Sequence, residues 1–277
     1  MKIAILGKGG SGKSSLSWLL VNYLASDMKY KTLAIDGDHN MDLTSNLGVD
    51  ETKLIYFKEF NSDFRKLSNM PDKGMWKVYF DCKPIEFNYP YDTKLKRFIY
   101  PVSTNLDLMV VGLGDQDLMN YNVCSHGVSA PLKYMLPTLK MENNSALVYD
   151  SVAGVDMLIY GLYFGFDVLL IVVEGHSNSI KVAKQIQSLA KLQNLPVKFC
   201  INKFSQSNEM LKQFMIEFKD EIIAQLPNDN GILQFDYNSI QESTKESLHS
   251  MIKDIPINST SSFELYNRLK TFEFQKK

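Results

Sequence analysis

The chain has 277 residues, of which 45% are hydrophobic and 22% are charged, and its formal net charge at pH 7 is −1. This length and apolar content predict one globular domain with a sizeable core. The near-zero charge provides no bulk attraction to nucleic acid or to anionic lipid. No apolar run approaches the roughly 18 residues that a membrane-spanning helix needs.

The first ten residues, "MKIAILGKGG", briefly resemble the apolar core of a signal peptide. They break into glycine after a few apolar residues, and no small-residue cleavage site follows. We therefore expect no signal peptide and a cytoplasmic protein. The three cysteines, Cys82, Cys124 and Cys200, show no pair spacing, which fits a reducing compartment.

The first 36 residues predict a strand, a glycine-rich loop, a helix and a second strand. A short apolar run ends at Gly7, apolar residues then recur at helical spacing over 13–26, and "KTLAID" (31–36) predicts the second strand. Such a βαβ unit has parallel strands and a right-handed crossover.

Residues 50–105 break this regular pattern, because they are rich in Lys, Asp, Asn, Pro and aromatic side chains. We predict a short helix near 51–68 and a small hairpin at 76–88. The stretch shows no apolar core of its own. We therefore interpret it as an irregular insertion or mobile region in a single domain spanning 1–277, not as a separate domain.

The remainder alternates strands and helices. Nearly continuous apolar runs predict buried strands at 105–112, 145–150, 167–174 and 196–202, the pattern of a parallel sheet covered on both faces. Helical patterns occupy 128–139 and 177–194. The sequence therefore predicts an α/β fold with a doubly wound, mostly parallel sheet.

The glycine-rich loop matches a phosphate-binding pattern. Gly7 to Ser14 satisfy G-x-x-x-x-G-K-[ST] between a predicted strand and a predicted helix. Backbone N–H groups and the positive helix end attract phosphates, while Lys13 contacts the β- and γ-phosphates and Ser14 ligates Mg²⁺. The pattern indicates a P-loop NTPase fold with ATP and Mg²⁺ as cofactors; a plain glycine turn is the alternative. The predicted nucleotide-binding residues of the loop are Gly9, Gly10, Ser11, Gly12, Lys13, Ser14 and Ser15.

Lys8 is a second lysine in a loop that Lys13 already closes. Residues 8–14 resemble K-G-G-x-G-K-[ST], the deviant P-loop of the family that includes MinD, ParA, the nitrogenase iron protein and the CooC-type maturation ATPases. The resemblance implies a homodimer in the ATP state, in which Lys8 reaches the nucleotide of the facing subunit. A solvated lysine is the alternative.

Acidic residues follow two of the predicted strands. Asp36 and Asp38 stand at the carboxyl end of the strand 31–36, where ligands bind in open α/β sheets, and Asp150 ends the strand 145–150. The resemblance implies that Asp38 orients the attacking water and that Asp36 and Asp150 support Mg²⁺ together with Ser14. It also implies a switch I at 38–48 and a switch II around Gly154. Two solvated acids in a turn would be the alternative for Asp36 and Asp38.

Two further positions extend the resemblance toward the base. Asn202, which follows the strand 196–202, matches an Asn-Lys position where the amide reads the adenine edge by donating and accepting together. Pro227 lies in a segment that resembles the one packed beside the base.

Residues 107–136 and 149–186 resemble the CooC-type ATPases, which assist nickel insertion into carbon monoxide dehydrogenase. That group carries C-x-C where this chain has Asn122-Val123-Cys124. A dimer would bring two Cys124 thiols together, with His126 as an assisting ligand, in a transition-metal site; a small buried thiol is the alternative. The iron protein's second cluster cysteine has no counterpart near Met157, so a four-thiolate cluster is not expected.

Three functions are compatible with these features. The first is an MgATP-dependent dimerising ATPase that serves as a CooC-like accessory factor for metal-centre insertion or enzyme maturation, with a client metalloenzyme or scaffold protein as partner. The second is a ParA/MinD-like positioning ATPase that binds DNA or membrane, which the balanced charge and the acids of the amphipathic tail disfavour. The third is a regulator with slow or no hydrolysis, because His39 replaces a common proline beside Asp38.

Overall fold

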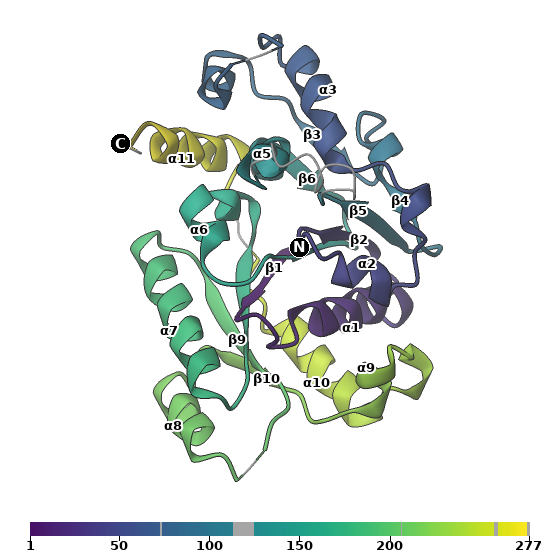
Figure 1. Ribbon diagram of the computed structural model, residues 1–277, viewed down its shortest axis with the longest axis vertical. Helices are drawn as coiled ribbons and strands as arrows, with labels where there is room; N and C mark the ends of the chain where they lie inside the picture. Colours follow the sequence, from purple (N-terminus) through teal and green to yellow (C-terminus); the bar gives the residue numbers. More distant parts are fainter. Residues whose placement is uncertain (73, 113–124, 206, 258–259, 276–277) are drawn as a thin grey trace.

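The computed structural model describes residues 1–277 apart from 73, 113–124, 206, 258–259 and 276–277 (Figure 1). Within these residues an eight-stranded sheet has the order β10-β9-β8-β1-β7-β2-β5-β4. All neighbours are parallel except β4, which runs antiparallel to β5. The strands are β1 (Lys2–Gly7), β2 (Lys31–Asp36), β4 (Tyr100–Pro101), β5 (Leu106–Val110), β7 (Ser145–Asp150), β8 (Val168–Val173), β9 (Val197–Ile201) and β10 (Ile222–Gln225). The predicted α/β fold with a mostly parallel sheet is confirmed.

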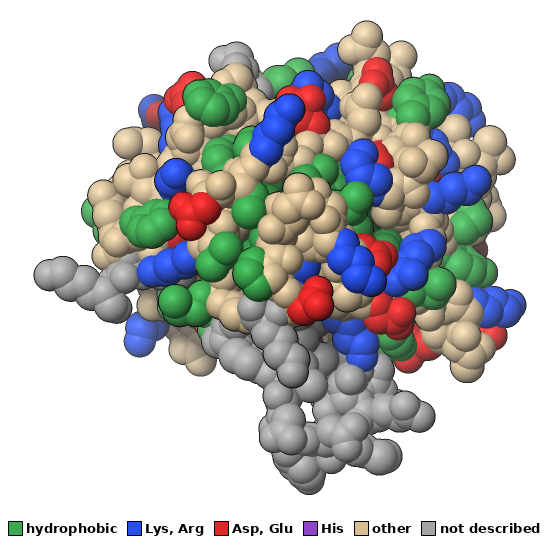
Figure 2. All heavy atoms as spheres, turned by 90° about the horizontal axis from the view of Figure 1, so that it is seen from above, with side chains coloured by type: hydrophobic (Ala, Val, Ile, Leu, Met, Phe, Trp, Pro, Cys, Tyr) green, Lys and Arg blue, Asp and Glu red, His purple; other side chains and the backbone are tan. Residues whose placement is uncertain are grey.

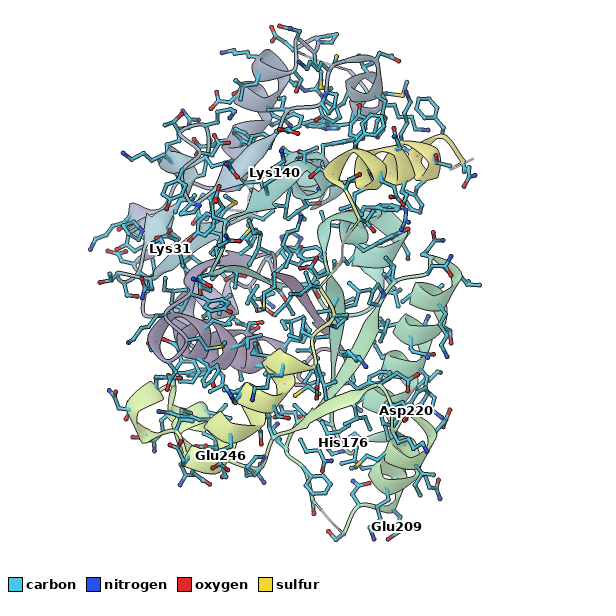
Figure 3. All side chains as sticks on the ribbon, turned by 180° about the vertical axis from the view of Figure 1, so that it is seen from behind. Lys31, Lys140, His176, Glu209, Asp220 and Glu246 are labelled. Atoms are coloured by element: carbon cyan, nitrogen blue, oxygen red, sulfur yellow. The ribbon has the colours of Figure 1, made fainter. Side chains whose placement is uncertain are left out.

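Helices cover both faces of this sheet (Figure 1). Successive residues of β1 point to opposite faces, so Ile3 and Ile5 enter one buried cluster, while Ala4 and Leu6 enter the other. The view from behind shows α9 and α10 beside α1, over the first cluster (Figure 3). The helices are α1 (Lys13–Ser26), α2 (Asp42–Asn46), α3 (Phe60–Leu67), α5 (Ser125–Met135), α6 (Asp156–Tyr160), α7 (Ser177–Leu192), α8 (Glu209–Glu217), α9 (Asn230–Gln234), α10 (Glu242–Lys253) and α11 (Ser262–Gln275).

The insertion at 50–105 differs from its prediction in two places. The helix near 51–68 is shorter than predicted, because two 3₁₀ turns precede α3. The hairpin at 76–88 is wrong: residues 76–81 form a 3₁₀ turn, and β3 (Phe87–Tyr89) pairs in parallel with the distant β6 (Leu139–Met141). Tyr79 and Phe80 explain the failure, because two consecutive side chains are buried, which the alternating faces of a half-buried strand do not allow.

The aromatic side chains of the insertion belong to one of the two main clusters. Phe60 contacts four other rings at centroid distances of 5.0–5.9 Å, those of Phe57, Phe64, Phe87 and Phe98. All five side chains are at most 2% exposed and join the cluster that also holds Ala4 and Leu6 of β1. The insertion is therefore packed through the same core as the sheet.

The last helix, α11, docks on α5 and on the insertion (Figure 1). Its Tyr266 ring lies 5.6 Å from that of Tyr79, and the Glu273 carboxylate meets the Lys133 ammonium of α5 at 2.6 Å. Both members of this ion pair are largely buried. Among the described residues, no helix combines the length and the apolar character that crossing a bilayer requires.

Candidate nucleotide-binding site

The glycine loop joins the end of β1 to the start of α1, as predicted. Gly12 precedes α1 in the left-handed conformation, with φ of 88°. A Cβ atom at Gly12 would overlap the amide nitrogen of Asn202, which donates a hydrogen bond of 3.0 Å to the Ser11 carbonyl oxygen. Backbone angle and close approach therefore both require glycine at this position.

The two lysines of the loop lie in different places. The Lys13 side chain is only 6% exposed and lines a cavity of about 350 Å³ at the start of α1. Lys8 does not line this cavity, and its ammonium donates to the Gly9 carbonyl oxygen at 2.9 Å on the exposed side of the loop. One cation thus lies inside the cavity, and the other is presented outside it.

Asp36 and Asp150 end two neighbouring strands and lie opposite each other in the register of β2 and β7. Both are fully buried. Burial raises the pKa of Asp150 to about 7; the neighbouring Ser14 hydroxyl opposes this shift, and Asp36 adds to it. The Ser17 hydroxyl donates to one Asp150 oxygen at 3.1 Å, whereas the other oxygen has no hydrogen-bond partner among the described residues.

The Asp36 carboxylate is hydrogen-bonded to the segment predicted as switch I. Its carboxylate accepts hydrogen bonds from the Thr44 backbone N–H at 2.8 Å, the Thr44 hydroxyl at 2.7 Å and the Asp38 N–H at 3.2 Å. Burial raises its pKa to about 6, although the bonds from Thr44 and Asp38 oppose the shift. Asp36 therefore ties α2 to the end of β2, and its support of Mg²⁺ stays a prediction.

Ser14 and Asp150 have the chemistry that a hard divalent cation prefers. Ser14 and Asp150 supply oxygen donors, which Mg²⁺ prefers, and one buried Asp150 oxygen lacks a hydrogen bond within the described chain. A nearby cation would also stabilise the two buried carboxylates in their charged forms. Ser14 and Asp150 thus fit a magnesium ion chemically, and the complete predicted set with Asp36 stays a prediction.

Asn202 and Pro227, the two residues predicted to lie near the base, also line the cavity. The Asn202 amide is already engaged by the protein, because its nitrogen donates to Ser11 and its oxygen accepts from the Lys203 N–H at 3.0 Å. It holds the loop in place, and adenine reading by this amide stays a prediction. Of the other predicted loop residues, Gly10, Gly12, Ser14 and Ser15 also line the cavity, while Gly9 and Ser11 do not.

The sequence analysis missed the segment after Pro227. Asp229, Ile232, Leu233 and Phe235 line the same cavity, together with Lys203, Asn228 and two residues of α2, Asp42 and Asn46. Asp229 is 2% exposed and accepts hydrogen bonds from the Gly231 N–H at 2.8 Å, the Gln241 N–H at 3.0 Å and the Thr244 hydroxyl at 2.7 Å. A local signal for this segment was present, because Asp229 stands where an aspartate can cap the short helix that follows it.

Asp38 lies outside the first cavity and lines a second one, of about 460 Å³. The same cavity is lined by His39 and Asn40 of the predicted switch I and, from the segment around the predicted switch II, by Val152, Ala153, Asp156 and Met157. One Asp38 oxygen accepts a hydrogen bond from the Asn40 N–H at 3.2 Å. The structure therefore brings the two predicted switches together around Asp38.

The possible transition-metal ligand, Cys124, lies outside the described residues, and the side chain of His126 is not described either. Within the described part of the chain, no group of three or more His, Cys, Asp or Glu side chains is arranged to hold a metal ion. The predicted site at Cys124 stays a prediction.

Comparison with known proteins agrees with this geometry. A carbon monoxide dehydrogenase accessory protein, CooC of Rhodospirillum rubrum, is 26% identical over 195 residues, covering 69% of each chain. An uncharacterised ATP-binding protein of Methanocaldococcus jannaschii is 28% identical over 243 residues, covering 84% of this chain and 90% of that protein.

Solved structures share the fold at lower identity. MinD of Pyrococcus horikoshii with Mg-ADP matches with a TM-score of 0.60 at 18% identity, covering 99% of this chain and 96% of the other. A putative plasmid partition protein of Borrelia burgdorferi bound to AMPPNP matches with a TM-score of 0.59 at 17% identity, covering 91% and 96%. The model of the CobQ/CobB/MinD/ParA nucleotide binding domain matches residues 2–238. The chain therefore belongs to the CobQ/CobB/MinD/ParA nucleotide-binding family.

Proposed function

We propose that this protein is an MgATP-dependent ATPase that dimerises around its nucleotide and serves as a CooC-like accessory factor in metal-centre insertion or enzyme maturation. The observation that carries the hydrolytic part is the buried Asp150 carboxylate beside Ser14, with one oxygen left without a hydrogen bond among the described residues. Such an oxygen is costly to bury unless a cation or water meets it in the working state.

Each residue then has a separate task. The loop N–H groups and Lys13 hold the phosphates inside the first cavity. Ser14 and Asp150 hold the Mg²⁺, which when bound neutralises charge on the β- and γ-phosphate oxygens. Asp38, at the meeting point of the switches, orients the attacking water.

Dimerisation rests on Lys8. Its ammonium bonds only to the backbone of its own loop among the described residues, and it lies outside the cavity that Lys13 lines. A facing subunit brought against the loop would receive this cation at its γ-phosphate, where added positive charge stabilises the transition state. We therefore expect hydrolysis to require two chains.

The accessory role is supported by the similarity to CooC, which extends over 195 residues. A positioning role like that of MinD or partition proteins is the second candidate, because the solved structures with this fold include both. Two observations disfavour it. α11 is docked by its buried residues, and on the face shown in Figure 2 basic and acidic side chains are interspersed without a basic patch.

Hydrolysis and dimerisation are tested together on the purified chain. We expect phosphate release with MgATP and a doubling of the mass in light scattering with a non-hydrolysable analogue. Lys8→Ala should retain nucleotide affinity but lose both hydrolysis and dimerisation, whereas Lys253→Ala, at the exposed end of α10, should behave as the wild type. A monomeric analogue complex, or full turnover by Lys8→Ala, would contradict the dimer mechanism.

Partner choice is tested by co-sedimentation with liposomes and with DNA, with and without ATP. No binding in either state is expected from an accessory factor. ATP-dependent binding to either would replace the accessory role by the positioning role. Metal analysis of the ATP-bound protein, with Cys124→Ser as comparison, then tests the transition-metal site.

A further inference from the structure

The cavity that contains Asp38 is also lined by Tyr149, to which the proposed function assigns no task. Tyr149 is the residue before Asp150 on β7, and it points to the opposite face of the sheet, where its ring packs 5.6 Å from that of Phe166. The side chain is 3% exposed, and it lines the cavity that contains Asp38.

The Tyr149 hydroxyl makes no hydrogen bond within the described part of the chain, although the side chain lines the cavity that contains Asp38. A phenol hydroxyl at a cavity wall can therefore donate to a polar group inside that cavity. The Asp38 carboxylate, which lines the same cavity, is an acceptor for such a donor.

Gly37, between the two acids of switch I, makes room for this side chain. A Cβ atom at residue 37 would lie 2.5 Å from two ring carbons of Tyr149, closer than any side chain tolerates. Gly37 is not among the residues with positive φ, so its backbone conformation does not demand glycine. The close approach of the Tyr149 phenol is what requires glycine at position 37. The two residues therefore fit each other at the start of the predicted switch I.

We propose that Tyr149 is a positioning residue for ATP hydrolysis: in the ATP-bound state its hydroxyl, which Gly37 admits into the cavity shared with Asp38, donates a hydrogen bond to the Asp38 carboxylate and fixes it for orienting the attacking water. The proposal rests on the hydrolytic function proposed above. In the described structure the Asp38 carboxylate accepts one hydrogen bond, from the Asn40 N–H, so a second donor would define its orientation.

The test uses Tyr149→Phe, which removes one oxygen and keeps the ring. The matched control is Tyr163→Phe, because Tyr163 is a buried tyrosine whose hydroxyl also makes no hydrogen bond in the described chain, but which does not line the cavity. We expect kcat of Tyr149→Phe to fall about tenfold, as loss of a hydrogen bond to a charged group implies, with KM and ATP affinity unchanged. Tyr163→Phe should keep the wild-type kcat.

A double-mutant cycle with Asp38→Asn identifies the partner. If Tyr149 acts through Asp38, Tyr149→Phe should cause no further loss in the Asp38→Asn background. An unchanged kcat in Tyr149→Phe, an equal loss in Tyr163→Phe, or additive losses in the cycle would overturn the positioning role and leave the ATPase proposal standing. A wild-type chain without turnover would instead refute the ATPase proposal itself, and the positioning role with it.

Discussion

The glycine loop and the insertion are built on different principles. The loop and its acids depend on a few residues at fixed spacing, each with its own contact, such as Asp36 with Thr44 or Asn202 with Ser11. The insertion depends on a cluster of rings that no single contact dominates. Substitutions in the glycine loop should therefore alter nucleotide binding more than stability. Substitutions in the insertion should alter stability more than nucleotide binding.

The largest effect should come from the insertion. Phe60→Ala removes a fully buried ring that touches four others, so we expect a loss of about 4 kcal/mol in the free energy of unfolding by urea. ATP affinity of the folded protein should stay within twofold. Phe263→Ala, at a side chain that is 69% exposed, should change stability by less than about 0.5 kcal/mol. Weakened ATP binding by Phe60→Ala in the folded state would break the comparison.

The converse experiment removes the buried cation of the loop. Lys13→Ala should weaken MgATP binding by at least about a hundredfold in calorimetry, because no other lysine of the loop lines the cavity. Lys253→Ala serves again as the control. An affinity loss below tenfold would mean that the backbone N–H groups hold the phosphates without this charge.

The docking of α11 should show an intermediate effect. Glu273→Gln leaves the Lys133 ammonium without its carboxylate in a largely buried position, and we expect a loss of about 2 kcal/mol in unfolding free energy. Glu264→Gln breaks a half-exposed pair with Arg268 on the same helix and should cost less than about 0.5 kcal/mol. Equal losses in the two variants would show that burial of the pair is irrelevant.

The smallest effect concerns pH. Because the folded pKa values of Asp150 and Asp36 are raised, the folded state holds protons there that the unfolded state has lost, so stability of the nucleotide-free protein should fall as pH rises from about 4 to 7. We expect Tm to decrease by about 5 °C over this range. Asp150→Asn should remove most of the decrease, and Mg²⁺ affinity should rise through pH 7 in the wild type only. A Tm that rises with pH equally in both proteins would contradict the assignment.

The sequence predicted the features whose residues lie close together along the chain. The P-loop glycines, Lys13 and the acids that end β2 and β7 were found because strand, loop and helix follow each other within a few residues. Asn202 and Pro227 were found through family resemblance and do line the same cavity.

Other parts could not be predicted because their partners are distant in sequence. β3 pairs with β6, about fifty residues away, so no hairpin signal could reveal it. Tyr149 and Gly37 are 112 positions apart, and neither is unusual until β2 and β7 place them in contact. Leu233 and Phe235 belong to the segment of the short helix α9, whose preceding residue Asp229 is bonded to Thr244 of the distant α10.

The hydrogen bond from the Asn202 amide to the Ser11 carbonyl oxygen should couple two parts of the nucleotide-binding cavity. It ties the residue after β9 to the glycine loop, so the parts of the cavity predicted to hold the base and the phosphates cannot relax independently. Adenosine and inorganic triphosphate, supplied as separate molecules, should therefore bind cooperatively, each lowering the dissociation constant of the other. Asn202→Ala should abolish this mutual enhancement before it abolishes binding of either fragment.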